Sequence, residues 1–370
     1  MSKVHLLGVG SMGSLLAHEL VQAHPYIVPN FTMLFKDSVS FDSFKHQDSK
    51  LIVNKLDNTS SFSTINSDYR VPVESKIENL IIATKTHQTT DALRKYVDHI
   101  TPDTNILLVQ NGMGMLEHLN STYWPYPERR PAIYQCISTH GAFKSSPFVV
   151  NHVGIGRLDI ARVTESSISG PSSNATSPYS DVKEMLTQQQ LPEFIRLILS
   201  TKVLNAHYLA YPQFLLKQIE KLIINTCINP LTAIFDCLNG ELLYSPSLTK
   251  TMMKIIREDI NVFKAEFPLL ETVPDTEAVL DEDRLLQSVI QVCRSTAKNS
   301  SSMREDVRLL KNTEIHWING YIVNLAKKHD ISANTNSFML DMVGEKLAIS
   351  RETEKHSIKT VLSQVNENLK

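Results

Sequence analysis

A lysine and two asparagines, spaced four residues apart, interrupt the largely apolar segment KLIINTCINP, which spans residues 221–230. If this segment is a helix, Lys221, Asn225 and Asn229 fall within one arc of about 80°, at about 100° per residue. A lysine can stabilise negative charge and donate a proton, and buried carboxamides need hydrogen-bond partners. The alternative is an ordinary amphipathic helix that shows this face to water. The apolar neighbours, and amides where Glu or Lys would be usual, argue for a site.

The motif GVGSMG places Gly8, Gly10 and Gly13 near the start of the chain. A strand-like segment precedes the motif, and a helix with apolar periodicity follows it. Glycines in this context permit a tight turn and let backbone N–H groups approach a pyrophosphate at a helix N-terminus. A glycine-rich turn without function is the alternative. The position between strand and helix predicts a dinucleotide-binding loop.

The end of the second expected strand, in FTMLFKD, indicates the type of cofactor. An NAD enzyme usually offers an acidic residue there to the ribose hydroxyls, whereas Lys36 offers a cation that suits a 2′-phosphate. The sequence therefore favours NADPH. In the alternative, Lys36 is a solvated lysine and Asp37 binds the ribose.

Two later loops are expected just beyond the carboxyl ends of strands, where ligands bind in open α/β sheets. ATKTHQ supplies Lys85 and Gln88, and LVQNGMG supplies Asn111. Taken alone, Lys85 resembles a surface lysine, and Asn111 followed by glycine resembles a plain turn.

The elements that must position these residues follow a simple order. Strand-like runs alternate with helical segments from the N-terminus, which predicts βαβ units and a parallel sheet. A smaller set of strands is expected in YQCISTHGAF and PFVVNHVGIGRLDIARV. After the Ser-rich segment 164–180, expected to be a loop or linker, helical periodicity dominates. We expect a dinucleotide-binding α/β domain over residues 1–190 and a helical domain over residues 191–370.

Bulk properties narrow the class of protein. With 370 residues and 42% hydrophobic content, the chain can form two domains, and its net charge of -2 gives no basic field for nucleic acid. No apolar run approaches the roughly 18 residues that cross a membrane. The strand-like start leaves no room for a leader peptide, so the expected location is the cytoplasm. No metal is expected: the four cysteines form no CxxC pair, and His87, His140 and His152 lack metal spacing.

The chain resembles the ketopantoate reductase family over nearly its whole length. The resemblance rests on GVGSMG, TKTHQ, QNGMG, KLIINTCINPLTAI followed by NGEL, and NSSSMREDVRLLKNTEIHWINGY. Long insertions around residues 40–70 and 160–195 are similar to the fungal type. The resemblance implies NADPH-dependent reduction of 2-dehydropantoate (ketopantoate) to (R)-pantoate, in pantothenate and coenzyme A biosynthesis. It also implies a Rossmann-like domain, an all-helical domain like the C-terminal domain of 6-phosphogluconate dehydrogenase, and a monomer or homodimer.

The resemblance also implies roles for single residues. Lys221 matches the catalytic lysine, on a helix facing the cleft between the domains, and Glu314 matches the acid near it. The residues implied for the substrate are Asn225, Asn229, Ser302, Asn111 and Asp306. The residues implied for the cofactor are Gly8, Val9, Gly10, Ser11, Met12, Gly13, Lys36, Lys85, Gln88, Asn111 and Glu314.

Alternatives remain for some of these positions. The family usually has Arg where this chain has Lys36, and a lysine cannot make the bidentate contact, so weaker discrimination against NADH is expected. Ser302 followed by Glu305 matches a helix capping box, although a helix N-terminus also suits a carboxylate. Glu314 alone would be a solvated helix residue. Two rival functions are a reductase of another small 2-oxo acid and a non-catalytic NADPH-binding regulatory protein.

Overall fold

Two compact units make up the chain, Met1–Leu215 and Leu216–Lys370. The computed structural model describes residues 2–70, 76–163 and 190–368, with side chains described as far as residue 358. The Ser-rich segment expected to be a linker lies outside the described residues. The division between the units comes later than the expected one after residue 190, because the next segment first adds a strand to the sheet of the first unit.

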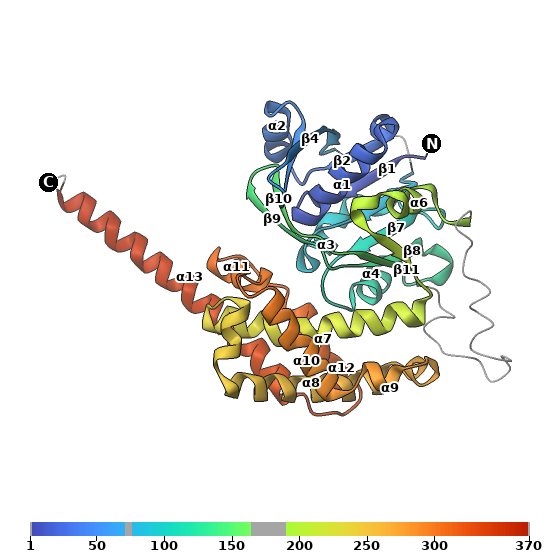
Figure 1. The fold of residues 1–370 in the computed structure, drawn as a ribbon. Helices are drawn as coiled ribbons and strands as arrows, with labels where there is room; N and C mark the ends of the chain where they lie inside the picture. Colours follow the sequence, from blue (N-terminus) through green and yellow to red (C-terminus); the bar gives the residue numbers. More distant parts are fainter. Residues whose placement is uncertain (1, 71–75, 164–189, 369–370) are drawn as a thin grey trace. The chain divides into compact units, whose positions relative to one another are not determined.

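A mostly parallel sheet forms the centre of the first unit (Figure 1). In the described part of this unit the strand order is β12-β11-β8-β7-β6-β1-β2-β5, and only β8 and β11 pair antiparallel. All residues of β1 and β6 are buried, as expected for parallel strands covered on both faces. The strands are β1 (Val4–Leu7), β2 (Phe31–Leu34), β5 (Asn66–Asp68), β6 (Asn79–Ile82), β7 (Asn105–Val109), β8 (Ala132–Ser138), β11 (Leu158–Arg162) and β12 (Ala206–Tyr208). The predicted Rossmann-like α/β domain is confirmed.

Helices connect these strands. The α-helices of the first unit are α1 (Ser11–Ala23), α2 (Ser38–His46), α3 (Thr86–Arg94), α4 (Met115–Tyr123) and α6 (Glu193–Ser200). Short 3-10 helices are η1 (Pro25–Asn30), η2 (Val97–His99), η3 (Pro127–Arg129) and η6 (Lys202–Leu204). In α1, Leu16, Ala17 and Leu20 join the core formed with strands of the sheet, which sets the orientation of the helix that follows the glycine motif.

A second, smaller sheet packs beside α1. Its strands are β3 (Lys50–Lys55), β4 (Ser60–Thr64), β9 (Gly141–Ser146) and β10 (Val149–Gly154), in the order β4-β3-β10-β9. Leu15 of α1 packs with Val53 and Val150 of this sheet. The strands expected after residue 133 are present, but only β9 and β10 belong to the smaller sheet, whereas β8 and β11 pair within the main sheet. The strands in the insertion around residues 40–70 were not expected.

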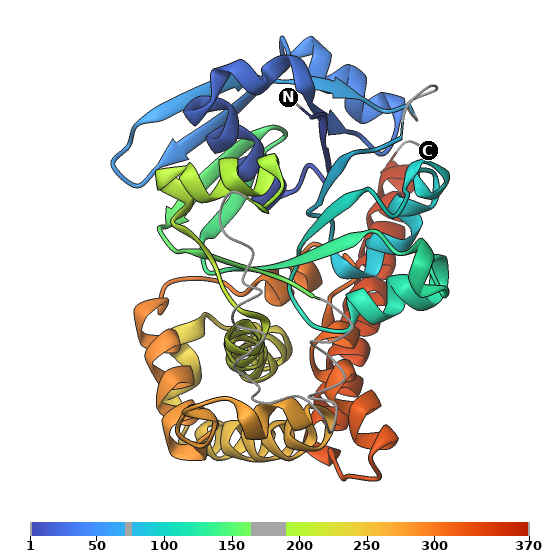
Figure 2. The same cartoon turned by 90° about the vertical axis from the view of Figure 1, so that its right-hand side faces the viewer.

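The second unit is helical in its described part, as predicted. Its elements are α7 (Tyr211–Phe235), α8 (Pro246–Glu266), α9 (Thr276–Val279), α10 (Glu282–Ser295), α11 (Ser302–Arg308), α12 (Asn319–Lys328) and α13 (Asn334–Asn368), with 3-10 helices η7 (Asn239–Tyr244), η8 (Pro268–Thr272) and η9 (Ile315–Trp317). Helix α7 begins at the end of the first unit. Figure 2 shows α7 end-on, with other helices of the unit around it. None of the described helices is both long and apolar enough to span a bilayer.

His18 of α1 joins the helix to the small sheet by hydrogen bonds. Its Nε2 lies 2.9 Å from Oγ of Ser61, and its Nδ1 lies 3.0 Å from Oγ of Ser63. Burial, and secondarily the positive charge of Lys55, lower the pKa of His18 to about 4. The imidazole is therefore neutral in the folded protein at neutral pH.

Acid should destabilise the protein partly through His18. The unfolded state binds a proton near the ordinary pKa of about 6.5, whereas the folded state binds it only near pH 4, so the free energy of unfolding falls as the pH falls through this window. When the pH is lowered from 7 to 5, the free energy of unfolding should fall by about 1–2 kcal/mol less in His18→Gln than in the wild type. Urea unfolding of both proteins at the two pH values measures this. Equal losses would show that His18 does not titrate in this way.

Candidate active site

The glycine turn after β1 leaves space for a ligand at one position. Gly8 has a φ of +107°, and a Cβ there would lie 2.5 Å from the backbone N of Thr84. A Cβ on Gly13 would lie 2.0 Å from the carbonyl oxygen of Gly8. These two glycines are required by the packing of the turn itself. A Cβ on Gly10 would meet only the oxygen of Ala83, at 3.8 Å, so protein packing does not explain this glycine. A closely approaching pyrophosphate does, which means that the turn fits a dinucleotide.

The N-terminus of α1 is suited to an anion. Its N-cap is Gly10, and no side chain caps the first turn. Backbone N–H groups at such an end remain available, and the helix dipole favours negative charge there.

The order of the strands brings further loops to the same sheet edge. β1 lies between β2 and β6, so the chain reverses direction across the sheet at β1, where ligands of open α/β sheets bind. Lys85 is half-buried at the N-cap of α3, three residues after the end of β6, and Asn111 is half-buried two residues after the end of β7. Gln110 ties the two loops by donating from Nε2 to the carbonyl of Thr84 at 2.8 Å. Gln88 is exposed in the first turn of α3.

At the end of β2, the two candidate ribose residues differ in their local roles. Asp37 caps α2 by accepting a hydrogen bond from the backbone N of Ser40 at 2.8 Å. This contact, with a smaller contribution from Lys36, holds the pKa of Asp37 below its usual value. The side chain of Lys36 is 82% exposed, with Nζ 3.6 Å from the Asp37 carboxylate. The lysine is therefore the side chain that projects from this strand end.

In the second unit, the polar stripe lies on α7. Lys221 and Asn225 are half-buried, and Asn229 is 7% exposed. Asn229 is therefore closed to water, whereas Lys221 and Asn225 remain partly accessible. The neighbours Ile223 and Cys227 are fully buried, which fits a helix surrounded by other elements.

A proline within α7 leaves one backbone carbonyl of the helix to accept a hydrogen bond from the segment after Glu314. Pro230 has no N–H, so the carbonyl of Thr226, four residues earlier, has no donor within the helix. Asn319 donates to this carbonyl from Nδ2 at 3.1 Å. Asn319 follows Glu314 by five residues. Its hydrogen bond therefore joins the segment that contains Glu314 to α7, the helix that carries Asn225.

A buried ring of hydrogen bonds completes this junction. The hydroxyl of Thr226 donates to Oδ2 of Asp259 at 2.6 Å, and Nδ2 of Asn336 donates to Oδ1 at 2.9 Å. Asn319 donates to Oδ1 of Asn336 at 2.9 Å and closes the ring. All four residues are fully buried, and burial raises the pKa of Asp259 well above its usual value despite these hydrogen bonds. The ring joins α7, α8, α12 and α13.

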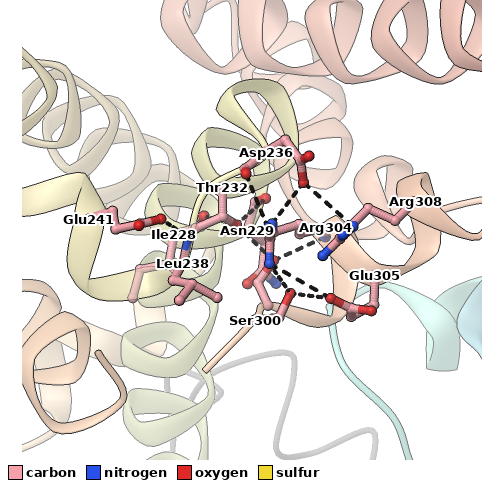
Figure 3. A network of polar contacts seen from close by, with 11 residues as sticks. Ile228, Asn229, Thr232, Asp236, Leu238, Glu241, Ser300, Arg304, Glu305 and Arg308 are labelled. Carbon is pink, nitrogen blue, oxygen red and sulfur yellow. Dashed lines mark hydrogen bonds and ion pairs between the residues drawn. The ribbon is translucent and has the colours of Figure 1, made fainter. Parts of the chain in front are cut away.

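A second junction holds the C-terminal end of α7 against α11 (Figure 3). Arg304 donates from Nε to Oδ1 of Asp236 at 2.9 Å and from Nη2 to the Asp236 carbonyl at 3.1 Å. Nη1 donates to Oγ of Ser300 at 3.0 Å. Thr232 donates to Oγ of Ser301 at 2.7 Å. These contacts fix the start of α11 relative to the end of α7.

The capping alternative for Ser302 is wrong by one residue. Ser301 is the N-cap of α11, and its Oγ accepts from the backbone N of Arg304 at 3.1 Å. Thr232 holds Ser301 in place, which is a tertiary contact that the local sequence does not show. Ser302 is exposed at the first helical position.

The two acidic candidates of the second unit are both buried. Asp306 is 7% exposed in α11, and Glu314 is 4% exposed at the N-cap of η9. The alternative of a solvated Glu314 is therefore wrong. Over residues 2–70, 76–163 and 190–368, no cluster of His, Cys, Asp and Glu is arranged to hold a metal ion. His140 and His152, which lack metal spacing in the sequence, are both buried, and Nδ1 of His140 lies 3.0 Å from Nε2 of His152.

Comparison with known proteins shows the family. Residues 4–165 match the family described as Ketopantoate reductase PanE/ApbA, and residues 213–347 match Ketopantoate reductase PanE/ApbA C terminal. A Schizosaccharomyces pombe protein named probable 2-dehydropantoate 2-reductase is 36% identical, covering 94% of this chain and 97% of the relative. The 2-dehydropantoate 2-reductase of Saccharomyces cerevisiae is 30% identical, covering 95% and 96%. The chain belongs to the ketopantoate reductase family of nicotinamide-dependent oxidoreductases.

Other similar proteins differ in their names. The cytochrome B translational activator CBS2 of Saccharomyces cerevisiae is 25% identical, covering 95% of this chain and 96% of the relative. A solved ternary structure of D-mandelate dehydrogenase with NADH and anilino(oxo)acetate has a TM-score of 0.74 at 20% identity, covering 94% of this chain and 99% of that chain. The latter likeness shows the fold alone.

Removing Arg304 should destabilise the junction of α7 and α11. The arginine side chain is 10% exposed and makes three hydrogen bonds, so Arg304→Ala should lower the free energy of unfolding by about 2 kcal/mol. Arg308 is the matched control, because it lies on the same helix, 3.8 Å from the same carboxylate, with its side chain 53% exposed. Arg308→Ala should change stability by less than about 0.5 kcal/mol. Equal effects in urea unfolding would show that the buried contacts do not hold the junction.

Proposed function

We propose that this chain reduces 2-dehydropantoate to (R)-pantoate with NADPH, a step in pantothenate and coenzyme A biosynthesis. The observation that carries the proposal is the stripe of Lys221, Asn225 and Asn229 on one helix, half-buried or buried in a chain of this family. The space at Gly10 in the turn after β1 supports a dinucleotide cofactor.

The reaction needs an acid as well as a reductant. When bound, NADPH supplies a hydride to the ketone carbon. Lys221 stabilises the negative charge that develops on the carbonyl oxygen and then donates a proton to it. Asn225 and Asn229 hold the hydroxyl and carbonyl oxygens of the substrate, which orients the ketone. We assign Glu314 to orient the lysine and to contact the cofactor.

The remaining residues divide between substrate and cofactor. Ser302, exposed at the start of α11, is assigned to the substrate carboxylate, and Asp306 to a further acidic position of the pocket. Asn111 is assigned to the region of the nicotinamide and the substrate. The other residues assigned to NADPH are Gly8, Val9, Gly10, Ser11, Met12, Gly13, Lys36, Lys85 and Gln88.

Two rival functions remain. One is a reductase of a different small 2-oxo acid, because the fold that this chain shares with D-mandelate dehydrogenase does not determine the substrate. The other is a non-catalytic role, because a translational activator is similar over nearly the whole chain. The lysine and both asparagines argue against the second, because a protein that only binds NADPH has no chemical need for them together.

One assay separates the three functions. Purified protein is given NADPH with 2-dehydropantoate, 2-oxoisovalerate or 2-oxo-2-phenylacetate, and NADPH oxidation is followed. The proposal expects kcat/KM to be highest for 2-dehydropantoate. Preference for another acid would change the substrate, and tight NADPH binding without oxidation of any acid would favour the regulatory role.

Loss of Lys221 should remove catalysis but not cofactor binding. Because the lysine acts most strongly in the transition state, Lys221→Ala should lower turnover by about 10² to 10⁴. The fold should persist, since alanine suits a helix at least as well. Lys254→Ala, which changes an exposed lysine of α8, is the control and should keep normal turnover. Near-normal turnover in a folded Lys221→Ala protein would exclude the lysine from the mechanism.

Lys36 should contribute to the preference for NADPH over NADH. Replacing it with alanine should reduce the ratio of the two binding constants by about 5-fold, because the contact is a single exposed charge pair. Lys45→Ala, at an exposed lysine of α2, removes the same charge from the neighbouring helix and should leave the ratio unchanged. Isothermal titration calorimetry gives both constants. An unchanged ratio in Lys36→Ala would assign the 2′-phosphate to another residue.

Two further expectations complete the proposal. The protein is expected to act in the cytoplasm and to be a monomer or a homodimer. Light scattering on the purified chain decides between the two assemblies.

A further inference from the structure

A lysine from the small sheet contacts the glycine turn. Lys144 of β9 is half-buried, and its Nζ donates to the carbonyl oxygen of Val9 at 2.5 Å. Val9 stands between Gly8 and Gly10, in the turn that the dinucleotide would meet. The ammonium also lies 5.6 Å from the centroid of the Phe148 ring. A positive charge is thus held beside the cofactor loop by a residue far away in the sequence.

The register of the β9–β10 hairpin fixes this lysine. Lys144 pairs with Val150 of β10, and Ala142, two residues earlier on the same face of β9, packs in the cluster with Met12 of α1. Figure 1 shows β9 and β10 beside α1. The strand therefore lies beside the N-terminal end of α1, next to the glycine turn.

An unusual backbone conformation anchors the same hairpin. Phe148 has a φ of +62°, which is rare for an aromatic residue and persists only where the surroundings stabilise it. Its ring is buried and packs 4.9 Å from the ring of Phe44 and 6.0 Å from the ring of Phe35, measured between centroids. Phe35 directly precedes Lys36. The hairpin therefore joins the glycine turn to the end of β2.

The contact of Lys144 with Phe148, whose ring packs against Phe35 next to Lys36, points to the group that Lys144 would bind. In dinucleotide-binding folds the end of β2 recognises the ribose of the adenosine half, and the 2′-phosphate when present. Lys36 alone is poorly equipped there, because it is exposed, lies 3.6 Å from an acidic neighbour and cannot bind bidentately. A second cation from β9 would supply the missing positive charge.

We propose that Lys144 binds the 2′-phosphate of NADPH together with Lys36 and so determines cofactor specificity. The proposal rests on the proposed NADPH-dependent function. The hydrogen bond from Lys144 to the Val9 carbonyl holds the ammonium at the glycine turn before the cofactor binds, which lowers the entropy cost of cofactor binding.

Calorimetry on substituted proteins tests this role without reference to catalysis. Lys144→Met keeps the stem that covers Phe148 and removes the charge, and Lys144→Arg keeps the charge. Lys50→Ala is the matched control, because Lys50 lies in the same small sheet with Nζ 5.6 Å from the centroid of the Phe62 ring. The ligands are NADPH, NADH, adenosine 2′,5′-bisphosphate and ADP.

The expected pattern is selective for the 2′-phosphate. Lys144→Met should raise Kd for NADPH and for adenosine 2′,5′-bisphosphate by about 10- to 100-fold, as for the loss of a hydrogen bond to a charged group. Kd for NADH and for ADP should change less than about 2-fold. Lys144→Arg should restore most of the affinity for NADPH, and Lys50→Ala should resemble the wild type. A thermal melt confirms that each variant is folded.

Three other outcomes overturn the proposal, each in a distinct way. Equal weakening of NADPH and NADH would place the charge at the pyrophosphate instead. No weakening of either would mean that Lys144 only satisfies the Val9 carbonyl. Failure of the wild-type protein to bind NADPH would overturn the proposed cofactor itself, and with it this role of Lys144.

Discussion

One backbone carbonyl of α7, that of Thr226, belongs to the ring of hydrogen bonds that joins four helices of the second unit. Pro230 removes the helical donor to the Thr226 carbonyl, and Asn319 takes its place. The same asparagine continues through Asn336 and Asp259 back to the Thr226 hydroxyl. Since every member is buried, loss of one partner leaves another without a hydrogen bond, at a cost of about 1–3 kcal/mol. The ring thereby holds α8, α12 and α13 against α7, the helix that carries Lys221.

Backbone groups without a partner inside their helix also occur in the first unit, but there no side chain of the protein caps them. At α7 the protein supplies its own donor to an orphan carbonyl. At the start of α1 no side chain caps the N–H groups, and Gly10 leaves space above them. The first case builds a rigid junction, and the second leaves a place for an anion. Both depend on residues that lack a normal group, an N–H in proline and a Cβ in glycine.

The relatives of this chain show why the fold alone does not define its chemistry. Proteins named 2-dehydropantoate 2-reductase, D-mandelate dehydrogenase and cytochrome B translational activator share most of its length or its fold. What separates such proteins is the set of side chains at the site. The half-buried lysine and the two amides on α7 are the features on which the proposed reductase function depends, and the cations near the glycine turn are those on which the proposed preference for NADPH depends.

The sequence alone determined the local features of this protein: the glycine turn, the alternation of strands and helices, and the spacing of Lys221, Asn225 and Asn229. Each follows from contacts within a few residues, such as helix periodicity or the lack of a Cβ. Only the tertiary structure decided the rest. Arg304 meets Asp236 from 68 positions away, Lys144 meets Val9 from 135 positions away, and Ser301 rather than Ser302 caps α11 because Thr232 holds it. Such contacts depend on which helices and strands pack together, and no pattern within one segment records that.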